Sequence, residues 1–398
     1  MRGSRGFRDE VCETKNAASC GNSLMLCSFT LPIAPHMKDF RKAFPVLEER
    51  TFLDTAFSGL IHPDAHEAGE HAHQEYLKNP SDFRMDFYFN TKSAIRDSSA
   101  QFLGVDRERI ALLPNFSTGM NLLLENLQVS KVMLLDEDYP SLTYPVTQRG
   151  IETVKLPGSV VSLDPKDIAK AIKSEKPDLL LVSHVHYNSG YISPIKEIAA
   201  ICREAGVRFV VDGTQAILLH EVRMDEWNID AYITSAYKWL LGGYGTGFMG
   251  ISERLLKEIT HRTASNNNMV FEDDGPTFQQ SIRCFELGHL DHVTFSRLLK
   301  GLEIAETIGP ERLRAQVDAL CRQFEAGLEA IGLEPIGGWD MPRRNILCIP
   351  YSEKIEKALQ EHDVVCSVRG KAIRFSIHAY NNENDIAEAQ KAIASTLS

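Results

Sequence analysis

The sequence predicts an α/β protein in which a mostly parallel sheet lies between layers of helices and is followed by a smaller α+β domain. Two observations predict the sheet: short runs rich in Val, Ile and Leu recur along the chain, and amphipathic helical patterns separate them. A third observation predicts the second domain, because longer helical patterns and two more strands follow Asp291. We therefore expect a large domain over 51–290 and a small domain over 291–398.

The strands of the large domain are predicted from apolar runs that are too short for helices. They are "KVMLLD" (131–136), "DLLLVSHV" (178–185), "VRFVVD" (207–212) and "DAYITSA" (230–236). The stretches "DPKDIAKAIKSEK" and "PIKEIAAICREAG" between them are typical of amphipathic helices. The run "GTGFMGIS" (245–252) follows a strand after a tight glycine turn, so we expect it to be antiparallel.

The small domain begins with a helix that buries one face. Apolar residues recur there at helical spacing, namely Phe295, Leu298, Leu299, Leu302 and Ala305. A second helix is predicted over 311–331, followed by the strands "NILCIP" and "AIRFSIH" and a last helix from about Asn384.

Composition limits the classes of partner and compartment. The 398 residues carry a net charge of −11, with 54 acidic and 43 basic residues, which argues against nucleic acid and anionic membrane as partners. The apolar runs are too short to span a bilayer. Eight scattered cysteines without a CxxC pair favour free thiols in a reducing compartment, so we expect a cytoplasmic protein.

The first 36 residues differ from the rest of the chain. A weakly apolar stretch, 24–34, follows several arginines, as in a targeting peptide, but Asp9, Glu10 and Glu13 interrupt the basic region. Met37 opens a stretch that is typical of a natural start. We interpret 1–36 as a disordered or non-native leader and expect 37–50 to pack with the small domain.

One lysine has unusual neighbours. Lys238 lies in "ITSAYKWLLGGYGTGF" (233–248), directly between Tyr237 and Trp239. Such a lysine is either a surface charge or a buried amine. A buried lysine has a lowered pKa and can act as a nucleophile.

Three other features also follow predicted strands, where open α/β sheets bind ligands. Ser117 and Thr118 lie where a strand ends and a helix begins, so they form either an anion-binding cup or a helix cap. Asp212 ends "VRFVVD" and is either a functional carboxylate or the cap of the next turn. Gln215 follows three residues later as a neutral hydrogen-bond donor.

Together these features suit one cofactor. Pyridoxal 5′-phosphate needs a lysine for a Schiff base, a carboxylate for the pyridinium nitrogen and a cup for the phosphate. Lys238, Asp212 and the pair Ser117 and Thr118 would provide these groups.

The sequence resembles the class V aminotransferase family of fold type I pyridoxal-phosphate enzymes, which includes cysteine desulfurases and isopenicillin N epimerase-like proteins. "VDGTQA" followed by "SAYK" matches the family's Asp-x-x-Gln and Ser-x-His-Lys pattern, with Tyr237 at the His position. The resemblance runs from about Thr51 to Ile386. It implies a fold type I large domain and places Ser235 and Tyr237 at the phosphate.

The resemblance implies further contacts with the cofactor. It places Tyr139 of "LLDEDYPS" on the pyridine ring, and Tyr187 or Asn188 of "SHVHYNSG" near the phenolic oxygen. In "RCFELGHL", His289 replaces a Thr that reaches the neighbouring subunit's phosphate in the family. "FLDTAFSG" resembles the N-terminal substrate loop, so Ala56 is expected to contact substrate.

A single arginine is expected to bind the substrate's α-carboxylate. "AIRFSIHAYNNENDI" (372–386) resembles the family signature Arg-x-Ser-x-x-x-Tyr-Asn, and Arg374 would bind the carboxylate in bidentate fashion. The alternative is an arginine that faces solvent on an edge strand.

Two other chemistries are disfavoured. Desulfurases carry a catalytic cysteine on a long loop before that arginine, whereas only four residues separate Arg369 from Arg374, and none is Cys. We interpret Cys366 as a packed thiol. His62 and His66 could share a helical face as metal ligands, but a solvated helix is favoured, and no metal is predicted.

The sequence therefore predicts a pyridoxal-phosphate enzyme that acts on a small amino acid through an external aldimine, with transamination favoured. Lys238 would hold the cofactor and then carry the proton at Cα. Epimerisation and β- or γ-elimination, including C–S cleavage, remain alternatives, as does a catalytically silent scaffold that binds the cofactor. By the resemblance, the protein is expected to be a homodimer.

Overall fold

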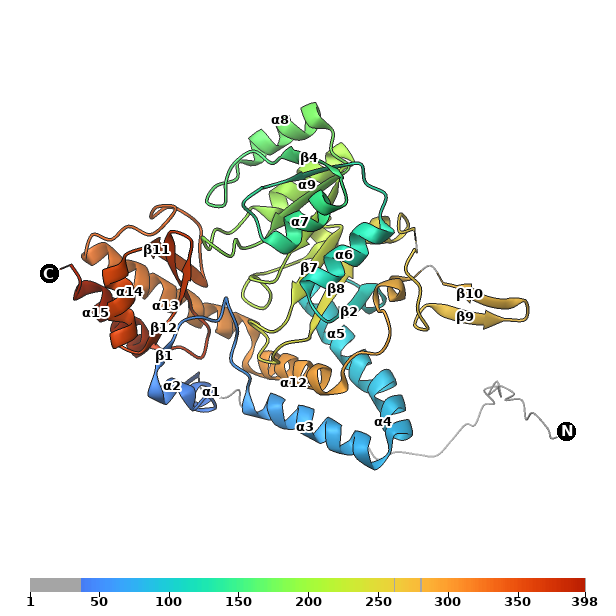
Figure 1. Cartoon of the computed structure of the whole chain (residues 1–398), viewed down its shortest axis with the longest axis horizontal. Helices are drawn as coiled ribbons and strands as arrows, with labels where there is room; N and C mark the ends of the chain where they lie inside the picture. The colour runs from blue at the N-terminus through green and yellow to red at the C-terminus, as the bar shows by residue number, and fades with distance from the viewer. Residues whose placement is uncertain (1–36, 261, 280, 398) are drawn as a thin grey trace, which may run out of the picture. The chain divides into compact units, whose positions relative to one another are not determined.

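The main sheet brings the ends of several strands to one edge. The computed structural model describes residues 37–260, 262–279 and 281–397, so the predicted leader, 1–36, lies outside the described residues. Seven strands follow the order β2-β8-β7-β6-β5-β3-β4 (Figure 1). Neighbours from β4 to β7 pair in parallel, whereas β8 is antiparallel to β7 and β2. The fold class predicted from the sequence is confirmed.

The strands β3, β5, β6 and β7 coincide with the predicted apolar runs, and the predicted antiparallel run is β8, whereas β2 was expected only as the strand before Ser117 and the largely exposed β4 was not predicted. Their bounds are β2 (Ile110–Leu113), β3 (Lys131–Leu134), β4 (Glu152–Lys155), β5 (Leu179–Ser183), β6 (Arg208–Asp212), β7 (Ala231–Ser235) and β8 (Gly247–Ile251). A hairpin of β9 (Met269–Glu272) and β10 (Gly275–Phe278) follows them.

Helices of very different length connect these strands. They are α3 (Pro63–Lys78), α4 (Pro80–Asp86), α5 (Lys92–Leu103), α6 (Phe116–Asn126), α7 (Pro140–Gln148), α8 (Pro165–Glu175), α9 (Ile195–Ala205), α10 (Met224–Trp227), α11 (Glu253–Leu256) and α12 (His292–Ile308). A π-helical turn, η1 (Phe87–Thr91), and two 3-10 turns, η2 (Arg107–Arg109) and η3 (Ile282–Phe285), complete this part.

Alternate residues of the central strands face two different cores, because side chains in a strand point to opposite faces. In β5, Leu180 and Val182 belong to one core, and Leu179 and Leu181 belong to the other. The first core includes residues of α8, α9 and α12, and the second includes residues of α6 and α7. Since both faces are covered, the strands read as continuous apolar runs rather than as alternating ones.

The C-terminal part builds a second sheet of β11 (Ile346–Pro350), β14 (Ala372–Ser376) and β13 (Ser367–Arg369), in that order and antiparallel. Its helices are α13 (Pro310–Ala330), α14 (Glu353–Glu361) and α15 (Glu383–Ala394). They enclose a third core, in which the rings of Phe324 and Phe375 meet edge to face at 4.9 Å. The helix α12 contributes to the first core instead, and the domain boundary near residue 290 stays a prediction.

The segment before the main sheet contacts the C-terminal part. It comprises α1 (Met37–Lys42), α2 (Val46–Glu49) and β1 (Thr51–Phe52), and β1 pairs in parallel with β12 (Val364–Val365). Arg41 forms an ion pair with Asp385 at 2.6 Å. The ring of Phe44 lies 5.0 Å from that of Tyr380. These contacts hold the following residues, 53–59, close to β14.

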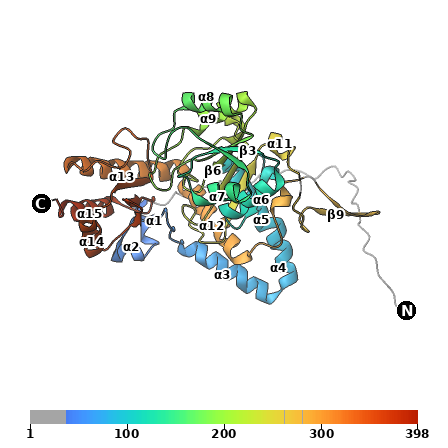
Figure 2. The same cartoon turned by 45° about the horizontal axis from the view of Figure 1, so that its top comes forward.

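Helices α3 and α12 lie side by side in both views (Figures 1 and 2). A Cβ atom at Gly69 of α3 would lie 2.6 Å from the side chain of Arg297 in α12, so the glycine permits this close approach. His62 caps α3, because its Nδ1 accepts a hydrogen bond from the Asp64 backbone N–H at 3.1 Å. In the described part of the chain, no helix combines the length and apolarity that a membrane span requires.

A buried carboxylate ties α5 to the segment after the hairpin. Glu286 is 1% exposed and lies 2.7 Å from Arg96 and 3.2 Å from Lys92. It also accepts the Leu112 backbone N–H of β2 at 2.9 Å. Burial alone would raise the pKa of Glu286, but the neighbouring cations Arg96, Lys92 and Arg283 outweigh it and lower the pKa.

Replacing Glu286 by Ala is expected to lower the melting temperature of the protein by several degrees. The variant would leave buried cations without their carboxylate, which costs about 3–5 kcal/mol. Glu108→Ala is the matched control, because Glu108 also contacts Arg283 but is 68% exposed, so the shift should be small. Thermal melting followed by circular dichroism measures both variants, and equal shifts would contradict this role of Glu286.

Candidate active site

The candidate site lies at the edge where the parallel strands end. Asp212 is the last residue of β6, and Ser235 is the last residue of β7, three residues before Lys238. Since β2 runs in the same direction as β7 through two antiparallel pairings, α6 begins at this edge as well. Asp138 and Tyr139 follow β3, and 184–188 follow β5.

Lys238 is a buried amine, and the alternative of a surface charge is excluded, because the residue is only 6% exposed. Its Nζ lies 5.4 Å from the ring centre of Tyr237 and 5.9 Å from that of Tyr139. Burial is the main cause that lowers the pKa of Lys238 to about 7, and Arg374 adds to it, while Asp212 opposes it. A substantial neutral fraction near neutral pH makes this amine nucleophilic.

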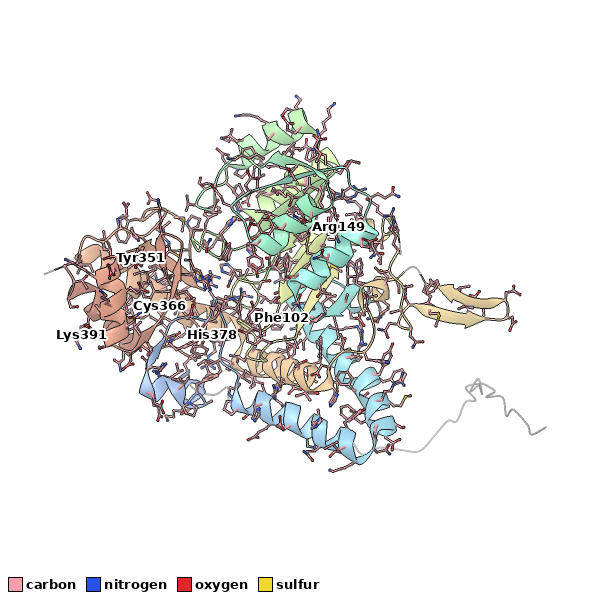
Figure 3. All side chains as sticks on the ribbon, in the orientation of Figure 1. Phe102, Arg149, Tyr351, Cys366, His378 and Lys391 are labelled. Atoms are coloured by element: carbon pink, nitrogen blue, oxygen red, sulfur yellow. The ribbon has the colours of Figure 1, made fainter. Side chains whose placement is uncertain are left out.

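The turn that carries Lys238 is held from two sides. The Gly59 backbone N–H donates to the Tyr237 carbonyl at 3.2 Å. A Cβ atom at Gly59 would lie 1.8 Å from the Lys238 carbonyl oxygen, so no side chain fits there. On the other side, the ring of His378 stacks on Trp239 at 5.9 Å with an interplanar angle of 8°, and Figure 3 labels His378 at this position.

Asp212 provides a buried carboxylate near this amine. It is 5% exposed, and its Oδ1 accepts the Thr214 backbone N–H at 2.8 Å. Burial is the main cause that raises the pKa of Asp212 to about 6, and the hydrogen bonds with Thr214 oppose the shift. The carboxylate is therefore largely ionised above pH 6 and could hold a protonated ring nitrogen.

The N-terminus of α6 could bind an anion. Asn115 caps the helix, since its Oδ1 accepts the Thr118 backbone N–H at 2.8 Å. The Ser117 hydroxyl donates to Ser141 at 2.8 Å, and the Ser235 hydroxyl accepts the Phe116 N–H at 2.8 Å. The structure thus brings Ser117, Thr118 and Ser235 together, with α6 providing the positive end of its dipole.

Four tyrosine rings and one amide side chain line the same region. The ring of Tyr139 lies 5.3 Å from that of Tyr187, and the ring of Tyr237 stacks on Tyr244 at 4.7 Å. The Oδ1 atom of Asn188 is buried without a hydrogen-bond partner in the described residues. An orphaned acceptor of this kind is typical of a position that a ligand completes.

Gln215 uses its amide within the protein. Its Nε2 donates to the Ala56 carbonyl at 3.0 Å, and its Oε1 accepts the Trp239 indole N–H at 3.2 Å. The Ala56 backbone N–H donates to the Ser376 hydroxyl at 2.8 Å. Gln215 therefore fastens the segment around Ala56 to the lysine turn.

Arg374 lies in the middle strand of the small sheet and is 1% exposed, which excludes the alternative of a solvent-facing arginine. Its Nη1 donates to the Tyr187 carbonyl at 2.9 Å, and its Nη2 lies 3.6 Å from Asp54 Oδ1. Nε and Nη2 form no hydrogen bond in the described part of the chain. Carboxylates bind this edge of a guanidinium in bidentate fashion, and here Nη2 already faces Asp54 while Nε has no partner among the residues described.

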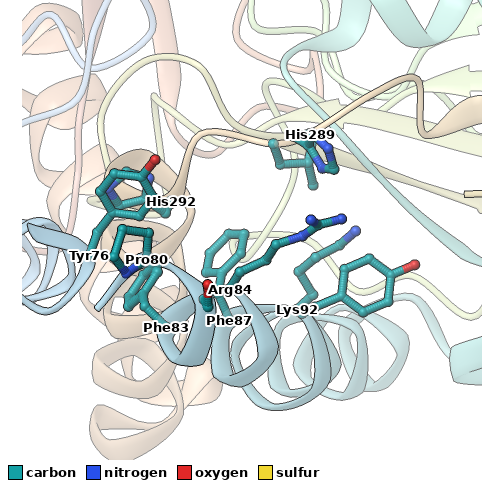
Figure 4. A pocket seen from close by; sticks show the side chains of 11 residues that line it. Tyr76, Pro80, Phe83, Arg84, Phe87, Lys92, His289 and His292 are labelled. Carbon is teal, nitrogen blue, oxygen red and sulfur yellow. The ribbon is translucent and has the colours of Figure 1, made fainter. Parts of the chain in front are cut away.

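His289 lies apart from these residues. It is exposed and lines a cavity of about 510 Å³ together with residues of α3, α4 and α5. In Figure 4 it lies across the cavity from Arg84 and Lys92. The contact of His289 with a neighbouring subunit's phosphate stays a prediction.

Sequence reasoning missed two buried carboxylates of the site, Asp54 beside Arg374 and Asp138, whose charge acts on Asp212. Asp54 is buried and accepts the Ser367 hydroxyl at 2.6 Å, and burial raises its pKa. Asp138 is buried behind Tyr139 and binds Ser183 through the backbone N–H at 3.0 Å and the hydroxyl at 2.6 Å. A carboxylate that directly follows an apolar strand-end run, as in "FLDTA" and "LLDEDY", is the signal that could have found them.

Residues 51–388 match the sequence model of the family Aminotransferase class-V. The chain belongs to this family. It is 22% identical over 362 residues to "Uncharacterized aminotransferase YcbU" of Bacillus subtilis, covering 90% of this chain and 97% of that protein.

Other similar proteins are named for other activities. Isopenicillin N epimerase of Streptomyces clavuligerus is 29% identical over 208 residues, covering 48% of this chain and 52% of that protein. The solved structure of the cystine C-S lyase C-DES in complex with its product cysteine persulfide has a TM-score of 0.80 at 21% identity. This match covers 88% of this chain and 99% of the lyase and supports the fold alone.

The family resemblance and the cofactor predicted from the sequence are confirmed, and the chain is a pyridoxal-phosphate enzyme of class V. The residues described above fit this cofactor. Lys238 supplies a buried amine, Asp212 a buried carboxylate, and the start of α6 an anion site. The described residues contain no cluster of three or more His, Cys, Asp or Glu that could hold a metal.

Cys366 does not have the properties of a reactive thiol. It lies between β12 and β13 of the small domain, where Figure 3 labels it, and it is half-buried. Burial is the main cause that raises its pKa to about 12. The thiol is therefore protonated at neutral pH and a poor nucleophile.

The buried environment of Lys238 predicts a midpoint near pH 7 for its reaction with an amine acylating reagent in the apoprotein. Asp212→Asn should lower this midpoint, because the carboxylate favours the ammonium form, and Arg374→Gln should raise it, because a repelling cation is lost. Peptide mass spectrometry over a pH series measures the reaction, with the peptide of the exposed Lys371 as internal standard for the reagent. A Lys238 midpoint several pH units above 7 would contradict the prediction.

Proposed function

We propose that this class V enzyme transfers the amino group of a small amino acid. The observation that carries the proposal is the open, buried edge of Arg374, which belongs to the same group of charges as Lys238 and Asp212. An α-carboxylate bound to Nε and Nη2 would fix the orientation of the amino acid relative to the lysine. The Bacillus subtilis relative, which matches nearly end to end, is also named an aminotransferase.

Pyridoxal phosphate, when bound, supplies an electron sink for the bonds at the substrate's Cα. Lys238 would hold the cofactor at rest and move the Cα proton once the substrate has displaced it. Its pKa of about 7 suits both tasks, because the amine can accept and return a proton near neutral pH. Asp212 would keep the cofactor's ring nitrogen protonated, and Ser117, Thr118 and Ser235 would hold the phosphate.

The aromatic residues would limit the cofactor's movement. The ring centre of Tyr139 lies 5.9 Å from Lys238 Nζ, and that of Tyr237 lies 5.4 Å from it. Both rings are therefore close to the amine that would attach to the cofactor. We propose that Tyr139 stacks on the cofactor ring and that Tyr237 contacts the phosphate. The orphaned oxygen of Asn188 is an acceptor for a protonated group on the ligand. Gln215 and Ala56 would act by shaping the substrate loop, since their polar groups already bind each other.

Two other outcomes of the same chemistry are the second candidates. The match to isopenicillin N epimerase supports epimerisation. The similar fold of the cystine C-S lyase C-DES supports elimination with C–S cleavage. A silent scaffold is disfavoured, because the lysine, the aspartate and the arginine are all present. The bond that lies perpendicular to the cofactor ring decides among the reactions, and Arg374 would control that orientation.

A panel of amino acids with product detection tests the proposal. The protein loaded with pyridoxal phosphate is incubated with each amino acid and a keto-acid acceptor, and keto acid, ammonia, sulfide and inversion at Cα are measured. We expect keto acid that depends on the acceptor, without ammonia or sulfide. Release of ammonia or sulfide would favour the lyase, inversion would favour the epimerase, and Lys238→Ala should be inactive in each case.

Arg374→Ala is expected to raise KM strongly for amino acids and to lower kcat, since a loosely held Cα samples wrong orientations. Arg374→Lys keeps the charge but cannot form the bidentate contact, so its kcat/KM should be intermediate. The ultraviolet–visible spectrum of the bound cofactor should stay normal in both variants. Loss of the cofactor with unchanged substrate affinity would contradict this placement of the carboxylate.

We propose that the protein is a homodimer, with His289 near the partner's phosphate site, by resemblance to the family. Sedimentation velocity measures the state, and a fully active monomer would contradict it. The five described cysteines are free thiols, which supports the expected cytoplasmic location.

A further inference from the structure

Two arginines of the small domain point from the same face of its sheet. Ser367 of β13 is the cross-strand partner of Arg374 in β14, so their side chains share a face. Arg369 lies two residues after Ser367 in the same strand and therefore points to that face too. Diagonal neighbours of this kind have their backbones about 7–8 Å apart.

The guanidinium of Arg374 already has a carboxylate partner within the protein. Asp54 lies 3.6 Å from Arg374 and is held in place by the Ser367 hydroxyl at 2.6 Å. Arg374 has a further fixed contact with the Tyr187 carbonyl. Its Nε forms no hydrogen bond within the described residues and, together with the Nη2 that faces Asp54, would bind one more carboxylate, which is the α-carboxylate in the function proposed above.

The guanidinium of Arg369 has no such carboxylate partner in the described part of the chain. Within the described residues, Arg369 forms no ion pair within 4.0 Å, and its Nε is buried without a hydrogen bond. Its guanidinium carbon lies 5.1 Å from the centre of the Phe57 ring, which is 54% exposed. Phe57 belongs to the same substrate-loop segment as Ala56, so the cation is held at the substrate loop rather than directed away from it.

Arg369 is also close enough to influence the reacting amine. Its positive charge contributes to the lowered pKa of Lys238 and acts on Asp54 as well. An anion that neutralised this charge would therefore lie within electrostatic reach of the lysine. An arginine on a surface unrelated to the site would not combine a contact with the substrate loop and an effect on Lys238.

We propose that Arg369 binds a second anionic group on the side chain of the substrate, so that the enzyme selects amino acids with a side-chain carboxylate. The inference rests on the function proposed above and names its substrate class. Arg374 would bind the α-carboxylate and Arg369 the distal one, with Asp54 and Ser367 between them. The spacing of the two arginines suits the carboxylates of a short dicarboxylic amino acid, whose ends approach both guanidiniums at once.

Calorimetric titration of the cofactor-loaded protein tests this subsite without requiring a reaction. Glutarate carries two carboxylates, and butyrate is the same molecule with one carboxylate replaced by hydrogen. We expect glutarate to bind at least about 10-fold more tightly than butyrate, since a charge-assisted contact is gained. Arg369→Gln should reduce this preference to within about 3-fold, whereas Arg374→Lys should weaken both ligands.

Lys371→Gln is the matched control, because it removes one positive charge from the adjacent turn, where Lys371 is exposed. This variant should keep the preference for glutarate. Steady-state kinetics give a second measure: the ratio of kcat/KM for glutamate to that for glutamine should fall about 10- to 100-fold in Arg369→Gln. Thermal melting checks that Arg369→Gln is folded. Arg369→Lys keeps the positive charge, so its ratio of kcat/KM for glutamate to that for glutamine should fall less.

Equal binding of glutarate and butyrate by the unaltered protein would overturn the inference and leave Arg369 as a solvated surface cation. The same loss of preference in Lys371→Gln and Arg369→Gln would overturn it too, since general charge would then explain the effect. Failure of the proposed function is distinct: a protein that prefers glutarate through Arg369 but yields no keto acid keeps this subsite and loses the transaminase assignment.

Discussion

The burial of one amine constrains the rest of this structure. Lys238 is removed from water between two tyrosine rings, and its turn is fixed by the backbone of Gly59 and by the stack of Trp239 on His378. A buried lysine is costly as a cation, and the protein meets that cost by lowering the pKa to about 7. Nucleophilic reactivity near neutral pH follows directly from this burial.

The other charges of the site are arranged around that amine in opposing pairs. Asp212 favours the ammonium form, while Arg374 and Arg369 disfavour it. Asp54 offsets Arg374 from the opposite side and is itself held by Ser367. The site therefore keeps buried ions close to partners, yet leaves free nitrogens on Arg374, which is the arrangement that an anionic ligand completes.

Much of this could be predicted from the sequence, because strand ends in a parallel sheet converge on one edge. The order of Asp212, Gln215 and Lys238 along the chain was sufficient to predict the cofactor and the family. Contacts between distant segments could not be predicted in this way. The amide of Gln215 binds Ala56, which is 159 residues away, and this contact depends on how the N-terminal segment packs.

The small domain illustrates the same limit. The sequence identified Arg374 from a motif, but the free guanidinium of Arg369 depends on the register of β13 against β14 and on the ring of Phe57. Similarly, "RCFELGHL" predicted a role for His289, whereas the structure shows it exposed and lining a cavity that Lys238 does not line. The predicted contact would need a second subunit, which a single chain does not contain.

The central claim is that Lys238 is the residue to which pyridoxal phosphate attaches. The most direct measurement is borohydride reduction of the cofactor-loaded protein, followed by digestion and mass spectrometry of the labelled peptide. The account predicts a single phosphopyridoxyl group on Lys238, because it is the buried lysine that faces the predicted phosphate and ring sites. Label on Lys92, which is also buried and has a lowered pKa but is paired with Glu286, would contradict it.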